Sequence, residues 1–240
     1  MLKIKKSLSE KITFSSKQRG LEQKRYITTP SSKLEDFLEK AREGLVPKKV
    51  QIIPSTWEKK PYWSIRWVRP RKGFEDIEKL LSPNEKQVLQ NYKEFGSRPI
   101  NLLLRNGILI SGSPTSEEEL KQQILTMDKA FQKVPLTSEN MFLFRGIRSD
   151  TKIYEHLDAN IGRIFTDNGF LSTTSNANIA QKFGKLILIK IPKGTKVIPL
   201  DFAAGTSSQK EEEILLPRNS RFKVSKENDQ IVLELLINEK

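Results

Sequence analysis

The sequence contains no cysteine and a single histidine, His156. Without thiols the chain can form no disulfide, thiolate metal site or cysteine nucleophile. A Ser-His-Asp triad would have to use His156, but the G-x-S-x-G turn that presents such a serine is absent. We therefore expect His156 to lie on the surface or at a helix end. GxGxxG and P-loop motifs are also absent, as is any metal-ligand spacing, so neither a Rossmann nucleotide site nor a metal site is predicted.

Long hydrophobic runs are missing as well. No stretch approaches the roughly 18 apolar residues that a membrane span needs. The first 20 residues contain lysines but no apolar core of a secretory signal. Hydrophobic residues make up 36% of the chain and charged residues 30%, which is typical of a soluble globular protein able to bury a core.

Positive charge is concentrated in the first third of the chain. Residues 1–72 carry 19 Lys and Arg against 7 Asp and Glu, a net charge of +12, whereas residues 73–240 carry 23 against 22. We therefore expect a basic N-terminal tail with a helical appendage (1–72) and a separate globular domain (73–240). The basic arm either steers the protein toward acidic proteins, nucleic acid or anionic lipid, or is a solvated tail that aids solubility.

Aromatic and basic residues alternate at the end of this basic region. Between residues 57 and 72, three tryptophans and one tyrosine lie among basic residues. Such a pattern can bind single-stranded nucleic acid by stacking, or it can be a docking segment whose aromatic side chains pack on the next domain. Pro54, Pro61 and Pro70 favour the docking segment, because they indicate an irregular connector.

The spacing of apolar residues is helical before Pro135 and strand-like after it. Ser82 and Ser116 are placed to cap helices, the first followed by a proline and the second by three glutamates that the helix dipole favours. The expected helices cover residues 31–42, 74–81, 83–95, 99–106, 116–131 and 178–183. The expected strands cover residues 141–147, 169–174, 186–191, 196–199, 211–216, 221–225 and 231–237. Helices first and strands later predict an α+β fold.

Arg145 closes the apolar strand that begins at Met141. Burial of a guanidinium is costly unless it meets an anion, and its planar fork suits a phosphate or a carboxylate. The next residue, Gly146, lets a ligand approach the backbone. This strand end is therefore a candidate anion site.

Ser172, Thr173 and Thr174 place three consecutive hydroxyl groups at the end of another strand. Hydroxyls in such a position can orient neighbouring carboxylates by hydrogen bonds. Serine and threonine are also ordinary strand residues, so the pattern by itself leaves both interpretations open.

Three glutamates precede the apolar residues 214–216. In a strand that starts at Glu211, the side chains of Glu211 and Glu213 project to the same face and that of Glu212 to the other. Two adjacent carboxylates repel, which raises the pKa of at least one of them. The pair is either a functional site or a solvated charge run at a strand start.

In this order, Arg145, Ser172-Thr-Thr and Glu211-x-Glu213 resemble the arginine–serine–glutamate class of mono-ADP-ribosyltransferase toxins. This class includes the enzymatic components of binary actin-modifying toxins and the vegetative insecticidal toxins. The resemblance covers about residues 74–237 and extends to three further motifs: Ile100-Asn101 with Arg105, Ile191-Pro-Lys-Gly-Thr195, and Pro217-Arg218 with Phe222. It implies an ADP-ribosyltransferase-like fold with a two-sheet β core around an NAD cleft, and it makes residues 73–240 the catalytic domain.

The resemblance also implies a role for each matching residue. Glu213 stabilises the oxocarbenium-like ribose that forms when NAD is cleaved. Glu211 orients the acceptor guanidinium and takes its proton. Ser172 bonds Glu213, and Arg145 anchors a phosphate and braces the site. The expected NAD-binding residues are Asn101, Arg105, Arg145, Gly146, Ser172, Thr173 and Phe183, without a metal.

Two features of related toxins are replaced here. Related toxins often carry an aromatic residue three positions before the first glutamate, where this chain has Ser208. A tyrosine often precedes their Ile-Asn motif, whereas here Ser97 lies four residues before Asn101.

In this class, a glutamate at the first position of the Glu-x-Glu motif accompanies arginine acceptors. The resemblance therefore implies transfer of ADP-ribose to an arginine of a target protein, with actin as the first guess, together with some NAD glycohydrolase activity. It also implies a monomeric, secreted bacterial toxin or effector that acts in the host cytosol. Two alternatives stay open: ADP-ribosylation of nucleic acid, and a binding module that kept the fold without catalysis.

Overall fold

The computed structural model describes residues 27–28, 76–148, 151–200 and 212–237. The helix expected at 31–42, the aromatic segment 57–72, the domain boundary at 72 and Glu211 all lie outside these residues. Within them, helices come first and most strands follow, so the expected α+β class is confirmed.

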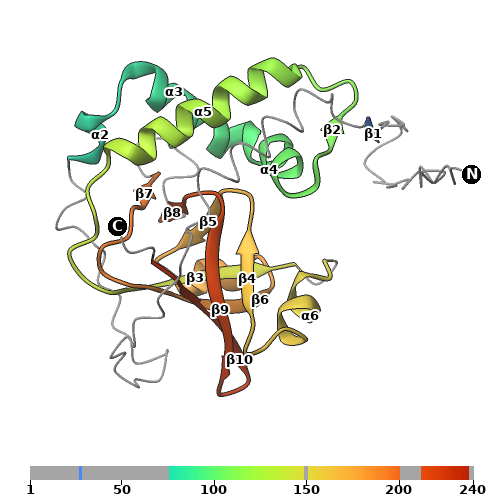
Figure 1. Ribbon diagram of the computed structural model, residues 1–240, viewed down its shortest axis with the longest axis vertical. Coiled ribbons are helices and arrows are strands. Elements are labelled where there is room, and N and C mark those ends of the chain that lie inside the picture. Colours follow the sequence, from blue (N-terminus) through green and yellow to red (C-terminus); the bar gives the residue numbers. More distant parts are fainter. Residues whose placement is uncertain (1–26, 29–75, 149–150, 201–211, 238–240) are drawn as a thin grey trace, which may run out of the picture.

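Consecutive helices form the upper layer in Figure 1. Ser82 caps α3 (Pro83–Asn91) and Ser116 caps α5 (Glu117–Lys133), each in a capping box with the glutamate three residues later. Both caps were predicted, because they depend on residues close in sequence. The layer is completed by the short α2 (Ile77–Leu80), the π-helical turn η2 (Tyr92–Gly96) and α4 (Ser97–Asn106). The turn η2 was not predicted.

Eight strands make one sheet with the order β4-β9-β10-β6-β3-β5-β8-β7. The β10–β6 pair is parallel and the others are antiparallel. Their bounds are β3 (Met141–Ile147), β4 (Ile164–Asp167), β5 (Leu171–Thr174), β6 (Lys185–Ile191), β7 (Ile198–Pro199), β8 (Glu213–Leu216), β9 (Ser220–Glu227) and β10 (Gln230–Leu235). A separate short ribbon pairs β1 (Ile27–Thr28) with β2 (Leu109–Ile110).

Strand β4 and the preceding helix α6 (Ile153–Asp158) were not predicted. His156 lies in the last turn of α6 and is exposed, as expected.

The sheet divides into two halves between β3 and β5. These strands share a single registered pair, Phe144↔Thr174, whereas β3 pairs with β6 along its whole length. Residues of both halves meet in one buried cluster, which includes Leu143 of β3 and Leu216 of β8. The expected two-sheet core therefore takes the form of two facing halves of one hydrogen-bonded sheet.

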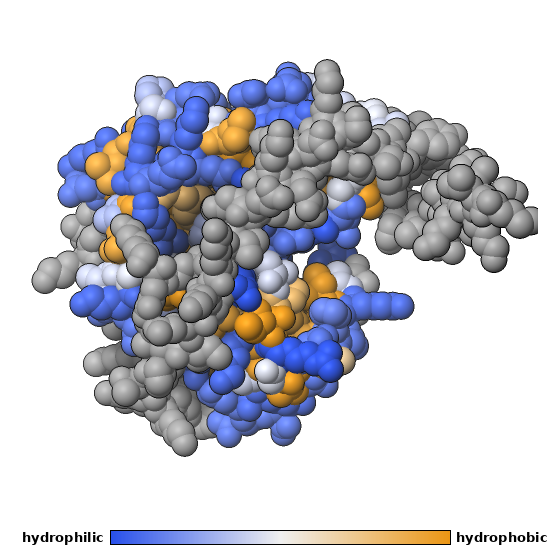
Figure 2. Space-filling model, in the orientation of Figure 1, coloured by the Kyte–Doolittle hydropathy of each residue, from blue (hydrophilic) through white to orange (hydrophobic). Residues whose placement is uncertain are grey.

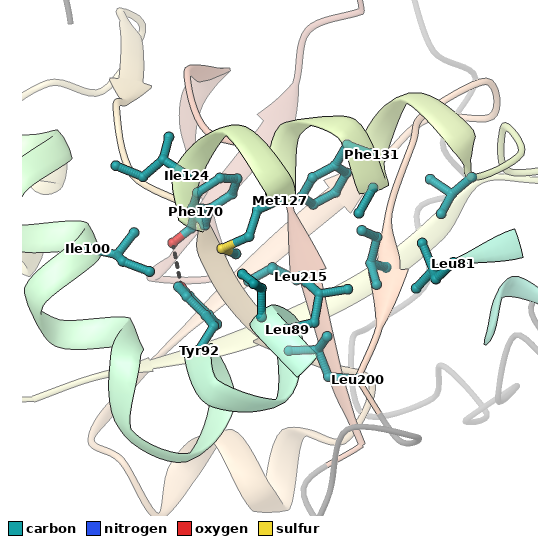
Figure 3. Packing of buried hydrophobic residues seen from close by; sticks show 14 of the residues in the cluster. Leu81, Leu89, Tyr92, Ile100, Ile124, Met127, Phe131, Phe170, Leu200 and Leu215 are labelled. Carbon is teal, nitrogen blue, oxygen red and sulfur yellow. Dashed lines mark hydrogen bonds between the residues drawn. The ribbon is translucent and has the colours of Figure 1, made fainter. Parts of the chain in front are cut away.

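Helices cover the outer faces of the two halves. The upper helices pack on β5, β7 and β8 through a cluster that includes Phe170, just before β5, and Leu215 of β8 (Figure 3). Phe170 is fully buried, stacks on Phe131 with ring centroids 5.9 Å apart, and meets the edge of Tyr92 at 6.0 Å. On the other half, α7 (Ala177–Gln181) covers β3, β6 and β10.

The face shown in Figure 2 is mainly hydrophilic over the helical layer, and apolar residues gather in small areas of the strand-rich half. Among the described residues, no helix has both the length and the apolar character that crossing a membrane requires. The same residues contain no cluster of side chains that could hold a metal ion.

Candidate active site

A cavity of about 370 Å³ lies where β3 and β5 diverge. Its walls come from β3, β5, β8, α7, η2 and the residues that follow β3. They bring together Arg145, Ser172 and Glu213, one residue from each of the three segments that the sequence singled out. Of the other expected site residues, Gly146, Thr173 and Phe183 also line the cavity.

Arg145 points into the space between the two half-sheets, because it lies on the same face of β3 as the inward-facing Leu143 and Ile147. Its guanidinium donates a hydrogen bond of 2.6 Å to the backbone carbonyl of Ser172. Burial lowers the pKa of Arg145, and the positive charge of Arg105 adds to this effect. A guanidinium stays cationic even so. Arg145 therefore braces the two halves and brings positive charge to the cavity.

The hydroxyl of Ser172 interacts electrostatically with the phenol of Tyr92. The same phenol accepts a bond of 2.9 Å from the amide of Asn101 and donates to the backbone carbonyl of Phe170 at 3.3 Å. Burial raises the pKa of Tyr92, so the phenol is neutral at physiological pH. The bond expected between Ser172 and Glu213 stays a prediction. Tyr92 is a site residue that the sequence analysis missed.

Glu213 begins β8 opposite Thr174, and its side chain is 13% exposed. Its Oε2 lies 3.9 Å from the Nζ of Lys93, a side chain that is only 1% exposed. Lys93 also donates to the backbone carbonyl of Leu200 at 3.3 Å. Lys93 was not predicted as a site residue because, in sequence, it looks like an ordinary polar helix residue.

Glu212 has a left-handed backbone with φ of 47°, and its Oε2 accepts a bond of 2.6 Å from the hydroxyl of Ser175. Strand β8 consequently begins at Glu213 and not at Glu211. The argument that placed Glu211 and Glu213 on one face required an extended residue between them. The expected strand start at Glu211 is therefore wrong, while Glu211 itself lies outside the described residues.

Asn101 and Arg105 hold the turn that leads into β5. The side-chain oxygen of Asn101 accepts a bond of 2.9 Å from the N–H of Phe170. Arg105 donates two hydrogen bonds, of 2.7 and 3.0 Å, to the carboxylate of Asp167. Gly169 fits tightly against both, since an added Cβ would lie 2.6 Å from the Asn101 oxygen. Neither residue lines the cavity, and their contact with NAD stays a prediction.

Gly146 permits the close approach of α7 to β3. An added Cβ would overlap the carbonyl oxygen of Ala180 and lie 2.8 Å from the Cβ of Phe183. The sequence analysis attributed this glycine to the approach of a ligand. The backbone of Ala180 also requires a glycine here, and the approach of a ligand to Gly146, which lines the cavity, stays a prediction. Phe183 lies on the cavity wall with 52% of its surface exposed.

The two threonines that follow Ser172 stabilise the strand ends. The hydroxyl of Thr173 donates to the carbonyl of Ile214 at 2.5 Å and so joins β5 to β8. That of Thr174 accepts a bond of 3.1 Å from the N–H of Asn176, the residue that caps α7. The hydroxyl run therefore shapes the cavity wall.

Known proteins share both the sequence pattern and the fold. The family model of the ADP-ribosyltransferase exoenzymes matches residues 67–239. An uncharacterized protein of Acanthamoeba polyphaga mimivirus, R217, is 30% identical in an alignment of 148 residues that covers 57% of this chain. The chain spans 20% of the length of that viral protein.

Solved structures agree with the family model. The C3larvin toxin, an ADP-ribosyltransferase from Paenibacillus larvae, is 25% identical with a TM-score of 0.52, covering 75% of this chain and 100% of that one. The C3 exoenzyme of Clostridium limosum is 23% identical (TM-score 0.54, 70% and 91% covered). C3stau2 from S. aureus, solved with NAD, is 20% identical (TM-score 0.54, 71% and 95% covered). The last two structures are similar to this chain in fold, and that fold is the one of the ADP-ribosyltransferases. On the strength of the family model, which spans most of it, the chain belongs to the ADP-ribosyltransferase exoenzyme family.

Proposed function

We propose that this protein is an NAD-dependent mono-ADP-ribosyltransferase that modifies an arginine of a target protein and acts as a toxin or effector. The observation that carries the proposal is the convergence of Arg145, Ser172 and Glu213 on one cavity. Family membership supports the transferase class. The structure of C3stau2 with NAD supports NAD as the substrate.

Glu213 is the proposed catalytic carboxylate. The bond between ribose C1′ and the nicotinamide nitrogen breaks, its electron pair moves onto that nitrogen, and positive charge develops on the ribose. A carboxylate that accepts a hydrogen bond from the ribose 2′-OH stabilises this charge. Glu213 suits this role because it lines the cavity and is partly exposed to it.

Glu211 is the proposed second carboxylate. A guanidine nitrogen of the acceptor arginine forms the new bond to C1′, and its proton passes to Glu211. When water takes the place of the guanidine, the products are ADP-ribose and nicotinamide, which is the NAD glycohydrolase reaction. The glutamate at this position supports an arginine acceptor.

The other proposed site residues bind NAD. Arg145 offers positive charge for the pyrophosphate, and Phe183 offers an exposed aromatic face to the nicotinamide ring. The complete proposed set is Asn101, Arg105, Arg145, Gly146, Ser172, Thr173 and Phe183.

We propose a secreted protein that acts in the host cytosol, with actin as the first target to examine. The target is open to direct measurement: labelled NAD is incubated with host cell lysate and wild-type protein, and the labelled peptides are identified by mass spectrometry. We expect modified arginine, and a loss of about 100-fold or more in the Glu213→Gln variant.

Glu139→Gln is the matched control, since Glu139 is exposed and does not line the cavity. Equal labelling by wild type and Glu213→Gln would refute the catalytic assignment. Label that nuclease removes and protease does not would instead support nucleic acid as the acceptor. Complete absence of NAD turnover would support an inactive binding module.

A further inference from the structure

The π-helical turn η2 places a lysine in the cavity beside the proposed catalytic glutamate. We propose that Lys93 is a positioning residue, whose ammonium keeps the Glu213 carboxylate ionised and oriented for the ribose. The inference rests on the proposed function and adds a residue to the arginine, serine and glutamate motifs.

Lys93 is buried to a degree that is rare for lysine. With 1% of its side chain exposed, its ammonium has lost almost all contact with bulk water. Its partners are the carbonyl of Leu200 at 3.3 Å and the carboxylate of Glu213 at 3.9 Å. Burial of an ammonium is costly unless it meets such groups. The fold therefore tolerates this lysine because the carboxylate and the carbonyl are there.

The geometry of η2 explains how the lysine reaches Glu213. A π turn accommodates an extra residue within a helix, and such turns are frequent at functional sites. Tyr92 and Lys93 are its first two residues. Tyr92 interacts with the hydroxyl of Ser172, and the ammonium of Lys93 lies 3.9 Å from the carboxylate of Glu213. One turn of backbone thus contacts both the serine and the glutamate of the proposed catalytic set.

The charge of Lys93 has a chemical consequence. A cation about 4 Å from a carboxylate favours the ionised form, which is the form that accepts a hydrogen bond from the ribose 2′-OH. Glu213 also interacts electrostatically with Tyr92 of η2 and with Arg145 of β3. Arg145, however, directs its guanidinium to the carbonyl of Ser172. The adjacent Glu212 is bonded to Ser175.

Three variants isolate the charge of Lys93. Lys93→Gln removes the charge and keeps a donor for the carbonyl of Leu200, whereas Lys93→Arg keeps the charge. Lys190→Gln is the matched control: Lys190 is similarly buried, with 11% of its side chain exposed, and its ammonium lies 2.6 Å from Glu227, outside the cavity.

The first readout needs no turnover. The carboxyl carbons of ¹³C-labelled glutamates are titrated by NMR, and the Glu213 signal is assigned with Glu213→Gln. We expect Lys93→Gln to raise the titration midpoint of Glu213 by about one pH unit. Lys93→Arg and Lys190→Gln should leave it where it is in the wild type. In the wild type, the ammonium nitrogen of Lys93 should shift at the same midpoint as the Glu213 carbon.

The second readout is the pH profile of NAD hydrolysis. The acid limb of kcat should move to higher pH in Lys93→Gln by the same amount, with KM changed less than about threefold. If the titration midpoint of Glu213 and the acid limb of kcat are the same in Lys93→Gln as in the wild type, the proposal is overturned. If KM rises in Lys93→Gln while the midpoint of Glu213 and the acid limb of kcat stay in place, the proposal is also overturned. The lysine would then be assigned to binding of the NAD phosphates.

The two proposals can fail separately. If the wild type does not cleave NAD, the proposed function fails, while the carboxyl titration still tests the pairing. If Lys93→Gln does not fold, Lys93→Met, which keeps the buried aliphatic stem, is titrated in its place. If the nitrogen signal of Lys93 in the wild type does not shift at the titration midpoint of the Glu213 carbon, the inference is overturned without any variant.

Discussion

The guanidinium of Arg145 donates a hydrogen bond of 2.6 Å to the backbone carbonyl oxygen of Ser172. The two strands that carry these residues share only one registered pair. A side chain therefore connects the strands where the main-chain ladder has ended. The carbonyl of Ser172 accepts this bond from Arg145, and its hydroxyl interacts with the phenol of Tyr92.

Arg145→Lys is predicted to weaken both the fold and catalysis. A lysine keeps the charge but not the planar fork, and its ammonium cannot reproduce the same contacts. We expect a loss of about 1.5–3 kcal/mol in the free energy of unfolding and at least about a tenfold fall in kcat/KM for NAD. Chemical denaturation and steady-state kinetics measure the two effects. Arg163→Lys, at an exposed arginine, should change neither.

Gly146→Ala is predicted to disturb the contact between β3 and α7. The added methyl group would overlap the backbone of Ala180, and such overpacking costs about 1–3 kcal/mol. Because α7 and Phe183 form a wall of the cavity, NAD binding should weaken as well. Calorimetric titration with NAD measures the affinity.

Gly194→Ala provides the comparison for Gly146→Ala. Gly194 has a φ of 88° but nothing within 4 Å of an added Cβ, so its substitution strains the backbone by about 1–2 kcal/mol and crowds no neighbour. Stability should fall while NAD affinity is retained. Equal effects of the two alanines on NAD affinity would contradict the role of Gly146 in the cavity wall.

Glu211→Gln is predicted to separate hydrolysis from transfer. The amide cannot take a proton from the acceptor guanidinium, whereas water still reacts at C1′ when Glu213 is intact. NAD hydrolysis should persist, and arginine labelling should fall by about 100-fold. Glu212→Gln is the control on the neighbouring glutamate, since its amide oxygen can still accept from Ser175. Full arginine transfer by Glu211→Gln would refute the assignment.

Glu85 is predicted to contribute to stability at neutral pH and to lose that contribution in acid. Burial alone would raise the pKa of Glu85, but hydrogen bonds from Lys133 and Ser82 outweigh it, so the pKa lies below its ordinary value of 4.5. A depressed pKa means that the folded state binds the proton less readily than the unfolded state. The stabilisation is therefore complete above about pH 4.5 and is lost as the pH falls through the folded value.

Denaturation of wild type and Glu85→Gln between pH 3 and 7 tests this expectation. The variant should be less stable by about 1–2 kcal/mol at pH 7, and the difference should shrink as the pH falls below about 4.5. Glu119 has the same capping-box role on α5 but is exposed, so Glu119→Gln should show a smaller difference. A gap between wild type and Glu85→Gln that does not change with pH would contradict the argument.

The helix starts at Ser82 and Ser116 and the strand at 141–147 could be predicted because their signals are local. A capping box spans four residues, and the apolar pattern of β3 sets its bounds within the strand itself. The three segments that meet at the cavity could also be identified, since each places polar residues beside an apolar strand.

Other features depend on tertiary contacts and left no such signal. The turn η2 interrupts a run of residues that reads as continuous helix, and the buried Lys93 lies within this turn. The left-handed backbone of Glu212 is maintained alongside a bond to Ser175, 37 residues away. Alternation along a strand was therefore a poor guide to Glu211. Strand β4 was missed because it is a short edge strand with exposed positions.

Among the described strands of the sheet, β3 and β5 are the neighbours with the fewest registered pairs, the lone pair Phe144↔Thr174. The longer ladders lie within each half, so a rotation of one half against the other about that pair would leave them intact while changing the width of the cavity. Such a rotation would break the side-chain bond from Arg145 to Ser172, which therefore opposes it.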